Sequence, residues 1–467
     1  AMASLRWAAL LAACLLVACV PGAHTSASSE KVTAMLVELG LTPDQIAKES
    51  QAMKDWIVGY RRKLHASPEL MYDLAETSAI VRAALDEMKV PYKYPVARQG
   101  VVGTIGSGKA PVVALRSDMD ALPVLEPTLN DTKEFASQYK GKMHACGHDG
   151  HMSMLLGAAK LLKEREAHLK GTVRLVFQPA EEGGAGGLMM YKEGVLNDPP
   201  VQRMFGMHLW PWIPTGQVGA KSGPVLAAAG LFEITITGAG GHAAAGIGIG
   251  VVDPIVAASA IVTSLQSIVS RDISPIDEGI VSVTMFNAGH AFNVVPDSVV
   301  IGGTLRAFSK DVYMKIENRA KEIVEFVARA HGCTVNQVYT SFAEDCFEKQ
   351  GLPPSFPSGC TYPPTVNDAE AWAMAKGVAG EFLGAENVKE VAPTMGGEDF
   401  AYFAERVPSA FVLIGIGNET KQTTAGLHSP MFKIDEDALP IGAALHVNMA
   451  LHALGELGGL KTKSGEL

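Results

Sequence analysis

The chain has 467 residues and a formal net charge of −10, and 48% of it is hydrophobic. An acidic chain without a basic run has no electrostatic attraction for nucleic acid, which excludes nucleic-acid binding as its function. The hydrophobic fraction is too high for a disordered protein, and the length allows two or three domains.

The first residues are typical of a targeting segment. Arg6 precedes a mostly apolar run at 7–20, which is shorter than the roughly 20 residues that span a bilayer and fits a secretory signal. We expect residues 1–27 to be a signal peptide for the secretory pathway, leading to the endoplasmic reticulum lumen or the cell exterior. The motif Leu16-Val17-Ala18-Cys19 resembles a bacterial lipoprotein signal, so a periplasmic location stays open. No later stretch predicts stable membrane insertion.

Strand and helix patterns alternate after this segment, which is typical of an α/β domain. Residues 28–50 are polar and predict either a poorly ordered lead-in or a docked helix. The hydrophobic spacing then predicts helices at 53–64, 75–88 and 149–163 and strands at 100–105, 112–116, 172–177 and 204–208.

The pattern changes near Gly223-Pro224. Strands at 231–237, 280–286, 299–305 and 334–339 and helices at 251–270 and 310–331 follow in the order β-α-β-β-α-β, which is that of a ferredoxin-like unit. The α/β pattern resumes with a helix at 368–382, a strand at 411–417 and a helix at 439–454. We therefore expect a catalytic domain in two parts, 28–225 and 343–467, interrupted by an α+β domain at 226–342.

The strongest chemical signal lies at 143–151, where three histidines, one cysteine and one aspartate follow each other closely. Cys146 and His148 are two residues apart just before a predicted helix, so their side chains can point into one space. Thiolate and imidazole are both good ligands for zinc and other divalent metals. The alternative is a buried free cysteine among surface histidines.

Further candidates follow predicted strands. Glu181 and Glu182 come directly after the strand at 172–177, where sites form in open α/β sheets. One carboxylate can bind metal while the other acts as general base, although a solvated acidic turn is the alternative. His208 and His428 are weak signals when each is taken alone.

Asp118 and Asp120 follow another predicted strand and precede Pro123. Their carboxylates can orient ligand imidazoles from behind, and the alternative is a polar turn. The candidate metal ligands are then five: Cys146, His148, Glu182, His208 and His428. Five ligands exceed the need of one tetrahedral zinc ion, whereas two ions about 3.5–4 Å apart would use them all, which favours hydrolysis.

Several longer motifs make a family resemblance plain. They are His65–Leu70, Ser117–Pro123, Met143–His151, Gln178–Gly183, Gly238–Ala244, Phe292–Asp297, Gly302–Arg306 and Thr394–Phe400. Over about 53–455 the chain resembles the M20 metallopeptidase and aminoacylase family. Within it, the chain resembles the amidohydrolase branch that contains plant auxin-conjugate (indole-3-acetyl-amino acid) hydrolases and bacterial hippurate hydrolases.

The resemblance implies a zinc-peptidase-like catalytic domain with a mixed sheet and an inserted ferredoxin-like domain that acts as lid and mediates dimerisation. It implies two divalent ions (Mn, Zn or Co) on the five ligands above, with Glu181 as the base. His242 matches a lid histidine that steadies the oxyanion, often in the partner's site, and Asn293 and Arg306 match residues that hold the substrate carboxylate. His65 matches a structural motif without a catalytic role.

The implied reaction is hydrolysis of N-acyl-amino acids, such as the indole-3-acetyl conjugates of auxin metabolism. A dipeptidase or carboxypeptidase on the same scaffold is the close alternative, and a binding protein with a silent site is the remote one. Compared with relatives, 343–360 reads as an insertion that contains Cys346 and Cys360. We hypothesise a disulfide there that closes a hinge loop and leaves Cys146 and Cys333 free.

Overall fold

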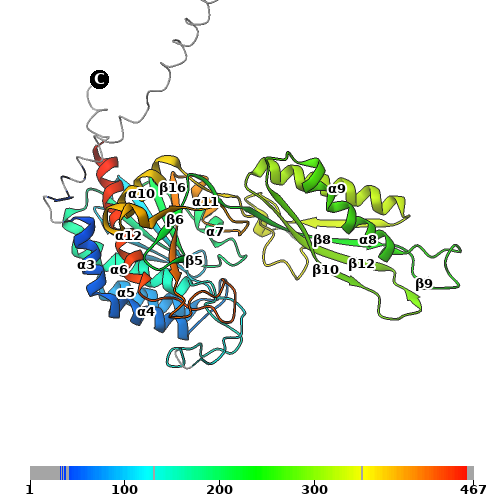
Figure 1. The fold of residues 1–467 in the computed structure, drawn as a ribbon, viewed down its shortest axis with the longest axis horizontal. Coiled ribbons are helices and arrows are strands. Elements are labelled where there is room, and N and C mark those ends of the chain that lie inside the picture. Colours follow the sequence, from blue (N-terminus) through cyan, green and yellow to red (C-terminus); the bar gives the residue numbers. More distant parts are fainter. Residues whose placement is uncertain are drawn as a thin grey trace, which may run out of the picture.

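The computed structural model describes residues 41–129, 132–348 and 351–459, together with Val32, Ala34, Leu36 and Val37. The predicted signal peptide, residues 1–27, lies outside the described residues. Two domains are joined by two antiparallel chain segments, in which Ala229 and Tyr362 exchange both backbone hydrogen bonds. The second domain extends away from the first (Figure 1).

The first domain contains an eight-stranded mixed sheet. Its strands in spatial order are β1 (Tyr92–Val96), β2 (Gly100–Gly106), β4 (Thr172–Gln178), β3 (Val112–Asp118), β5 (Arg203–Pro214), β16 (Ser409–Gly417), β6 (Val218–Ala220) and β15 (Val388–Glu390). The four central strands β4, β3, β5 and β16 are parallel, so their carboxyl ends meet at one edge, where α/β sheets carry their sites.

Helices cover both faces of this sheet. One face packs against α3 (Pro43–Ala52), α4 (Lys54–Ala66), α5 (Ala75–Glu87), α6 (His148–Glu164), α10 (Ala369–Leu383) and α12 (Ala438–Gly459). The other face packs against the short helices α7 (Gly186–Lys192) and α11 (Ala401–Ala404). Because β3 is buried on both sides, Val113 and Leu115 enter one core while Val112 and Ala114 enter the other.

The second domain has a four-stranded antiparallel sheet in the order β10 (Gly279–Ala288), β12 (Ser298–Ala307), β8 (Ala228–Thr237) and β13 (Thr334–Tyr339). Helices α8 (Pro254–Leu265) and α9 (Lys310–Ala330) cover one face. This is the ferredoxin-like arrangement, and it occupies residues 228–339. The strands alternate, so Phe232 and Ile234 meet the helices while Ala229 and Leu231 lie on the face without helices.

Two small sheets complete the fold. At the tip of the second domain β9 (Gly241–His242) pairs with β11 (Val294–Val295), and near the joint β7 (Gly223–Leu226) pairs with β14 (Thr365–Asn367). Two helical stretches, Pro254–Asp272 and Ala438–Gly458, are long and apolar enough to cross a membrane by length and composition. The second is 89% buried inside the structure, and α8 in the first packs against the sheet of its own domain.

Most predicted elements are confirmed, and of the two alternatives for 28–50 the docked helix is the one observed at Pro43–Ala52. The predicted end of the strand at His208 is wrong, because β5 continues to Pro214. It does so by pairing with β16 across an irregularity between Gly415 and Gly417. A side chain at Gly415 would meet Pro214 O at 2.0 Å, so glycine permits this close approach.

Candidate metal centre and active site

The five predicted metal ligands lie together at the carboxyl edge of the sheet. Sγ of Cys146 is 3.4 Å from Nε2 of His208, and Nε2 of His428 is 3.4 Å from Oε1 of Glu182. The same Glu182 oxygen is 3.9 Å from Nε2 of His148. Donor atoms at these separations can share metal ions, and the overlapping groups Cys146–His148–His208 and Cys146–Glu182–His428 have one member in common.

Local backbone geometry brings the ligands from separate elements. Gly147 has a φ of 96°, which glycine adopts readily and which turns the chain so that His148 begins α6. His428 comes from the loop after β16, and its backbone N–H donates to Ala145 O at 2.8 Å. The two ligand-bearing loops are therefore fixed to each other.

Hydrogen bonds set the orientation of two ligand imidazoles. Nδ1 of His148 donates to the carbonyl oxygen of Asp120 at 2.7 Å, and Nδ1 of His208 donates to the carbonyl oxygen of Leu209 at 2.8 Å. With Nδ1 engaged as a donor, Nε2 of each ring is the atom that faces the cluster and that can give its lone pair to a metal ion. Nε2 of His148 is buried and has no hydrogen-bond partner among the described residues.

The charges of the site also favour cations. Burial lowers the pKa of His148, but the carboxylates of Asp118, Asp120 and Glu182 outweigh it and raise this pKa to about 10. An apolar core would not tolerate so many carboxylates around one imidazole without compensating charge. A divalent ion can replace the proton that this imidazole binds. The buried imidazole nitrogen, the thiol and the carboxylates together fit two divalent ions.

Glu181 lies beside the cluster and is held by its backbone. Its N–H donates to Oδ1 of Asp120 at 2.8 Å, and its carbonyl oxygen accepts from the Tyr362 hydroxyl at 2.7 Å. Burial, together with Glu398 and Glu182, raises the pKa of the Glu181 carboxyl well above its ordinary value. A fixed carboxyl of raised proton affinity is suited to take up and return a proton.

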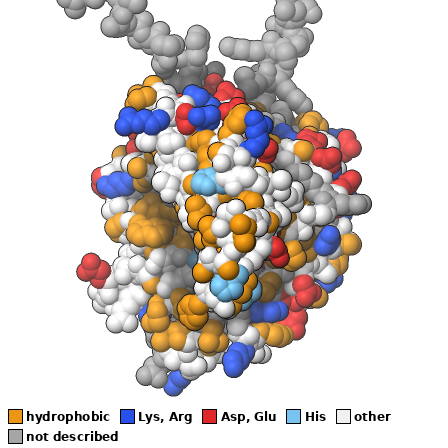
Figure 2. Space-filling model, turned by 90° about the vertical axis from the view of Figure 1, so that its right-hand side faces the viewer, with side chains coloured by type: hydrophobic (Ala, Val, Ile, Leu, Met, Phe, Trp, Pro, Cys, Tyr) orange, Lys and Arg blue, Asp and Glu red, His pale blue; other side chains and the backbone are white. Residues whose placement is uncertain are grey.

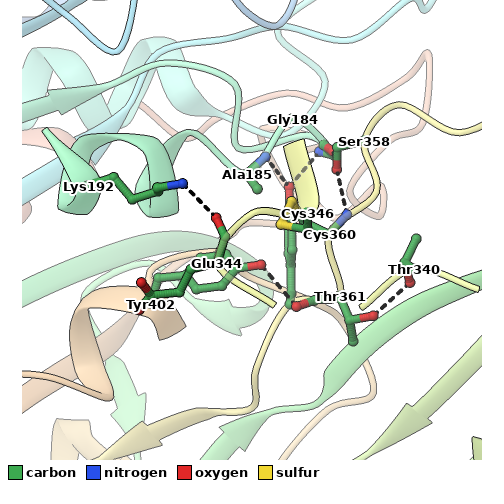
Figure 3. The surroundings of a disulfide bond; sticks show 12 residues. Gly184, Ala185, Lys192, Thr340, Glu344, Cys346, Ser358, Cys360, Thr361 and Tyr402 are labelled. Atoms are coloured by element: carbon green, nitrogen blue, oxygen red, sulfur yellow. Dashed lines mark hydrogen bonds between the residues drawn. A yellow bond between two sulfur atoms is a disulfide. The ribbon is translucent and has the colours of Figure 1, made fainter. Parts of the chain in front are cut away.

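The predicted disulfide between Cys346 and Cys360 is present, and Cys146 and Cys333 are free thiols. It lies close to the loop that carries Glu181 (Figure 3). The Ser358 hydroxyl donates to Gly183 O at 2.7 Å, and the Tyr362 hydroxyl accepts from the N–H groups of Gly183 at 3.0 Å and Ala185 at 2.9 Å. The insertion therefore supports the active-site loop from the joint between the domains.

A cavity of about 690 Å³ opens between the two domains at this cluster. Residues of the metal cluster form one wall, and the uncovered sheet face of the second domain forms another, including Arg306 of β12. The Arg306 Nε donates to Oγ1 of Thr304 at 3.0 Å. No carboxylate of the described residues lies within ion-pair distance of this half-buried guanidinium, so it is available to an anionic group in the cavity.

His242 and Asn293 are placed differently. They lie at the tip of the second domain, where Ala243 N–H donates to Asn293 O at 3.0 Å, and neither lines the cavity. In Figure 1 β9 is at the end farthest from the catalytic domain. Nδ1 of His242 accepts from the N–H groups of Ala244 and Ala245 at 3.2 and 3.1 Å. The proton is therefore on Nε2 of an exposed ring.

Asp118 and Asp120 lie beside the ligands, but the prediction that their carboxylates orient ligand imidazoles is wrong among the described hydrogen bonds. Oδ2 of Asp118 is 3.6 Å from Nε2 of His148, and Nδ1 of that ring bonds the carbonyl oxygen of Asp120 and not its carboxylate. Oδ1 of Asp118 is 2.6 Å from Nδ1 of His151, and the two carboxylate oxygens of Asp120 accept the N–H groups of Glu181 and Glu182. The sequence interpretation missed the partner of this region, Arg116. Its buried guanidinium reaches Asp118 at 2.8 Å, Glu398 at 2.8 Å and Asp399 at 3.0 Å. In the sequence, Glu398 and Asp399 form an adjacent pair of carboxylates without a nearby cation, which is the signal that points to a distant cationic partner.

The family model described as Peptidase family M20/M25/M40 matches residues 114–452. The chain belongs to this family. The IAA-amino acid hydrolase ILR1-like 2 of Arabidopsis thaliana is 47% identical over 89% of each chain. The N-acetylcysteine deacetylase of Bacillus subtilis is 38% identical over 85% of this chain and 97% of its own.

Solved structures agree with this assignment. The YXEP protein of Bacillus subtilis, described as a dinuclear metal binding peptidase from the M20 family, superposes with a TM-score of 0.70 at 33% identity. The match covers 86% of this chain and 99% of that one. The resemblance expected from the motifs is thus confirmed, and the M20 chain described here is a metal-dependent amidohydrolase.

Proposed function

We propose that this M20 enzyme hydrolyses the amide bond of N-acyl-amino acids, with indole-3-acetyl or other aryl- and alkyl-acyl conjugates as substrates. The observation that carries the proposal is one cavity lined by four of the five predicted ligands, by the buried Glu181 and by the unpaired Arg306, with the fifth ligand, His148, directly beside Glu182. Relatives named for IAA-amino acids and for N-acetylcysteine act on N-acyl-amino acids, which gives the substrate class.

The roles of the residues follow from their chemistry. Cys146, His148, Glu182, His208 and His428 would hold the metal ions, which would supply Lewis-acid activation of water and of the amide carbonyl when bound. Glu181 accepts the proton of the attacking water and returns it to the leaving amine. Arg306 binds the carboxylate of the amino acid, because a guanidinium can donate two parallel hydrogen bonds to a carboxylate. The native metal is one of Mn, Zn or Co, and the mixed thiolate and carboxylate set accommodates each.

We also propose that His242 and Asn293 act in a second copy of the chain. Nε2–H of His242 is an exposed donor suited to a developing oxyanion, yet it lies away from the cavity of its own chain. Exposed hydrophobic residues flank β9 and β11, among them Ile249 and Phe292, and Figure 2 shows hydrophobic side chains gathered on this end of the molecule. Strand β10 is an open sheet edge with Met285 and Phe286 exposed, which suits a homodimer through the lid domain.

The location proposed is the secretory pathway. The apolar run at 7–20 and the Cys346–Cys360 disulfide support it, because disulfides persist in oxidising compartments.

The test is the release of free amino acid from apo-protein reloaded with Mn, Zn or Co. Indole-3-acetyl, benzoyl and acetyl amino acids and a few dipeptides are the substrates. We expect metal-dependent release from acyl amino acids and a fall in kcat of roughly 10²- to 10⁴-fold in Glu181→Gln. Glu322→Gln, at an exposed position on α9, is the matched control with unchanged kcat. Release from dipeptides alone would move the enzyme to the peptidase alternative, and no release with any metal would contradict the proposal.

A further inference from the structure

The continuation of β5 past the metal cluster places two tryptophans on the same side of the strand as a ligand. The rings of His208, Trp210 and Trp212 all face the cavity, whereas Leu209 is buried in the core on the other face of the sheet. Beyond Trp210 the pairing of β5 with β16 is irregular, and Ile213 packs into the same core as Met204. Exposure increases along the shared face, from 7% at His208 to 61% at Trp212. All three residues line the cavity between the domains.

The three rings form a continuous series. The ring centroids of His208 and Trp210 are 5.7 Å apart, and those of Trp210 and Trp212 are 5.0 Å apart, both in edge-to-face arrangements. The series therefore leads away from the metal cluster, from the buried His208 to the exposed Trp212. A large exposed indole at the end of such a series is not explained by the packing of the core.

The surroundings of the tryptophans are apolar and open. A side chain at Gly426 would lie 3.3 Å from the Trp212 ring, so glycine lets the loop before His428 pass close to the indole. Leu231 and Ile280 of the second domain line the same cavity. Arg306, the unpaired cation, also belongs to that domain, and it lies near Gly397 rather than Gly426.

We propose that Trp210 and Trp212 form the acyl-group subsite, and that Trp212 selects planar aromatic acyl groups over short alkyl ones. The inference rests on the proposed function: with the carboxylate at Arg306 and the amide at the metal cluster, the acyl group extends along the apolar wall that the tryptophans form. An aromatic ring packs on indoles in offset or edge-to-face geometry and gains more than an alkyl group of equal area. The acyl group of an acetyl conjugate is too short to reach Trp212.

The experiment compares kcat and KM of the metal-loaded enzyme for indole-3-acetyl-alanine and N-acetyl-alanine. In Trp212→Ala we expect KM for the indole-3-acetyl substrate to rise roughly tenfold, with KM for the acetyl substrate within twofold of wild type. Trp212→Phe keeps an aromatic face and restores the preference, whereas Trp212→Leu does not. Trp56→Phe, on α4 beside Tyr60, is the matched control and changes neither KM.

A binding measurement separates failure of the subsite from failure of the proposed function. Calorimetric titration of the product acids into metal-loaded wild type and Trp212→Ala should give tighter binding of indole-3-acetate than of acetate, and only in wild type. Equal effects of Trp212→Ala on both substrates, or equal binding of indole-3-acetate by both proteins, would overturn the subsite. Wild-type protein that hydrolyses no acyl amino acid yet binds indole-3-acetate through Trp212 would contradict the function and leave the subsite standing.

Discussion

The buried imidazole of His65 interacts with two carboxylates, so its contribution to stability depends on its ionisation. Its Nδ1 is 2.7 Å from Asp149 and its Nε2 is 3.1 Å from Glu126, and the ring is buried. Burial and the nearby Arg61 lower its pKa, but the two carboxylates outweigh them and raise the pKa above its ordinary value. Removing this imidazole would take one hydrogen-bond partner from each of the carboxylates of Asp149 and Glu126.

The raised pKa predicts a pH-dependent contribution to stability. The imidazole binds its proton more tightly in the folded protein than in the unfolded chain, where its pKa is about 6.5. Its contribution to stability is therefore complete at pH values below about 6.5 and is lost as the pH rises through the pKa of the folded state. The difference in Tm between metal-saturated wild type and His65→Asn should therefore be largest near pH 6 and shrink at higher pH. His168→Asn, at an exposed position, is the control. A difference that does not change with pH would contradict this role.

The hydroxyl of Tyr362 fixes the backbone of the loop that carries Glu181. It donates to one carbonyl oxygen and accepts from two N–H groups of the segment that carries Glu181. Tyr362 belongs to the chain segment that returns from the second domain, so Glu181 is supported by a residue 181 positions away. Sequence spacing carries no signal for such a contact.

At the scale of elements, the insertion closed by the Cys346–Cys360 disulfide packs at the joint between the domains. Both cysteines are buried in a small cluster with Ala185, Leu188 and Tyr402, and Figure 3 shows Thr361 and Tyr402 beside them. The Tyr402 hydroxyl donates to Thr361 O at 2.9 Å. The Ser355 hydroxyl donates to Oε2 of Glu233 on β8 at 3.0 Å, so the loop is attached to both domains.

Removal of this disulfide should destabilise the protein. Opening a loop of about 15 residues costs about 3 kcal/mol in the chain-entropy model, so Cys346→Ser/Cys360→Ser should lower Tm measurably in thermal denaturation. Thiol titration of denatured, unreduced wild type should count two free thiols, Cys146 and Cys333, once residues 1–27 are absent. Four thiols, or an unchanged Tm, would show that the bridge is not formed or not stabilising. Cys333→Ser is the single-thiol control.

The arrangement of the whole molecule separates two groups of predicted residues. The catalytic domain and the near end of the second domain bring the metal ligands, Glu181 and Arg306 to one cavity. His242 and Asn293 lie at the opposite end of the second domain. A complete site that includes them requires a second chain, if they act as the family resemblance implies.

Complementation tests this arrangement. Co-expression of Glu181→Gln and His242→Ala chains gives mixed dimers in which one site has an intact base and an intact histidine from the partner. Random pairing then yields about one quarter of wild-type activity, although each variant alone is nearly inactive. A mixture as inactive as its parents would show that His242 does not act across the dimer, and gel filtration checks that dimers form.

The motifs and hydrophobic periods of the sequence were sufficient for the fold class, most elements and the family. Local patterns carry this information because a strand or helix is defined by neighbouring residues, and because Met143–His151 and Gln178–Gly183 bring several ligands within a few positions. The length of β5 was underestimated, since its last residues are held by the bulged pairing with β16 and not by their own periodicity. The support of Glu181 by Tyr362, the Arg116 ion pairs and the position of His242 depend on contacts between distant segments. Those features form only when segments far apart in the chain fold together, and no local pattern encodes that geometry.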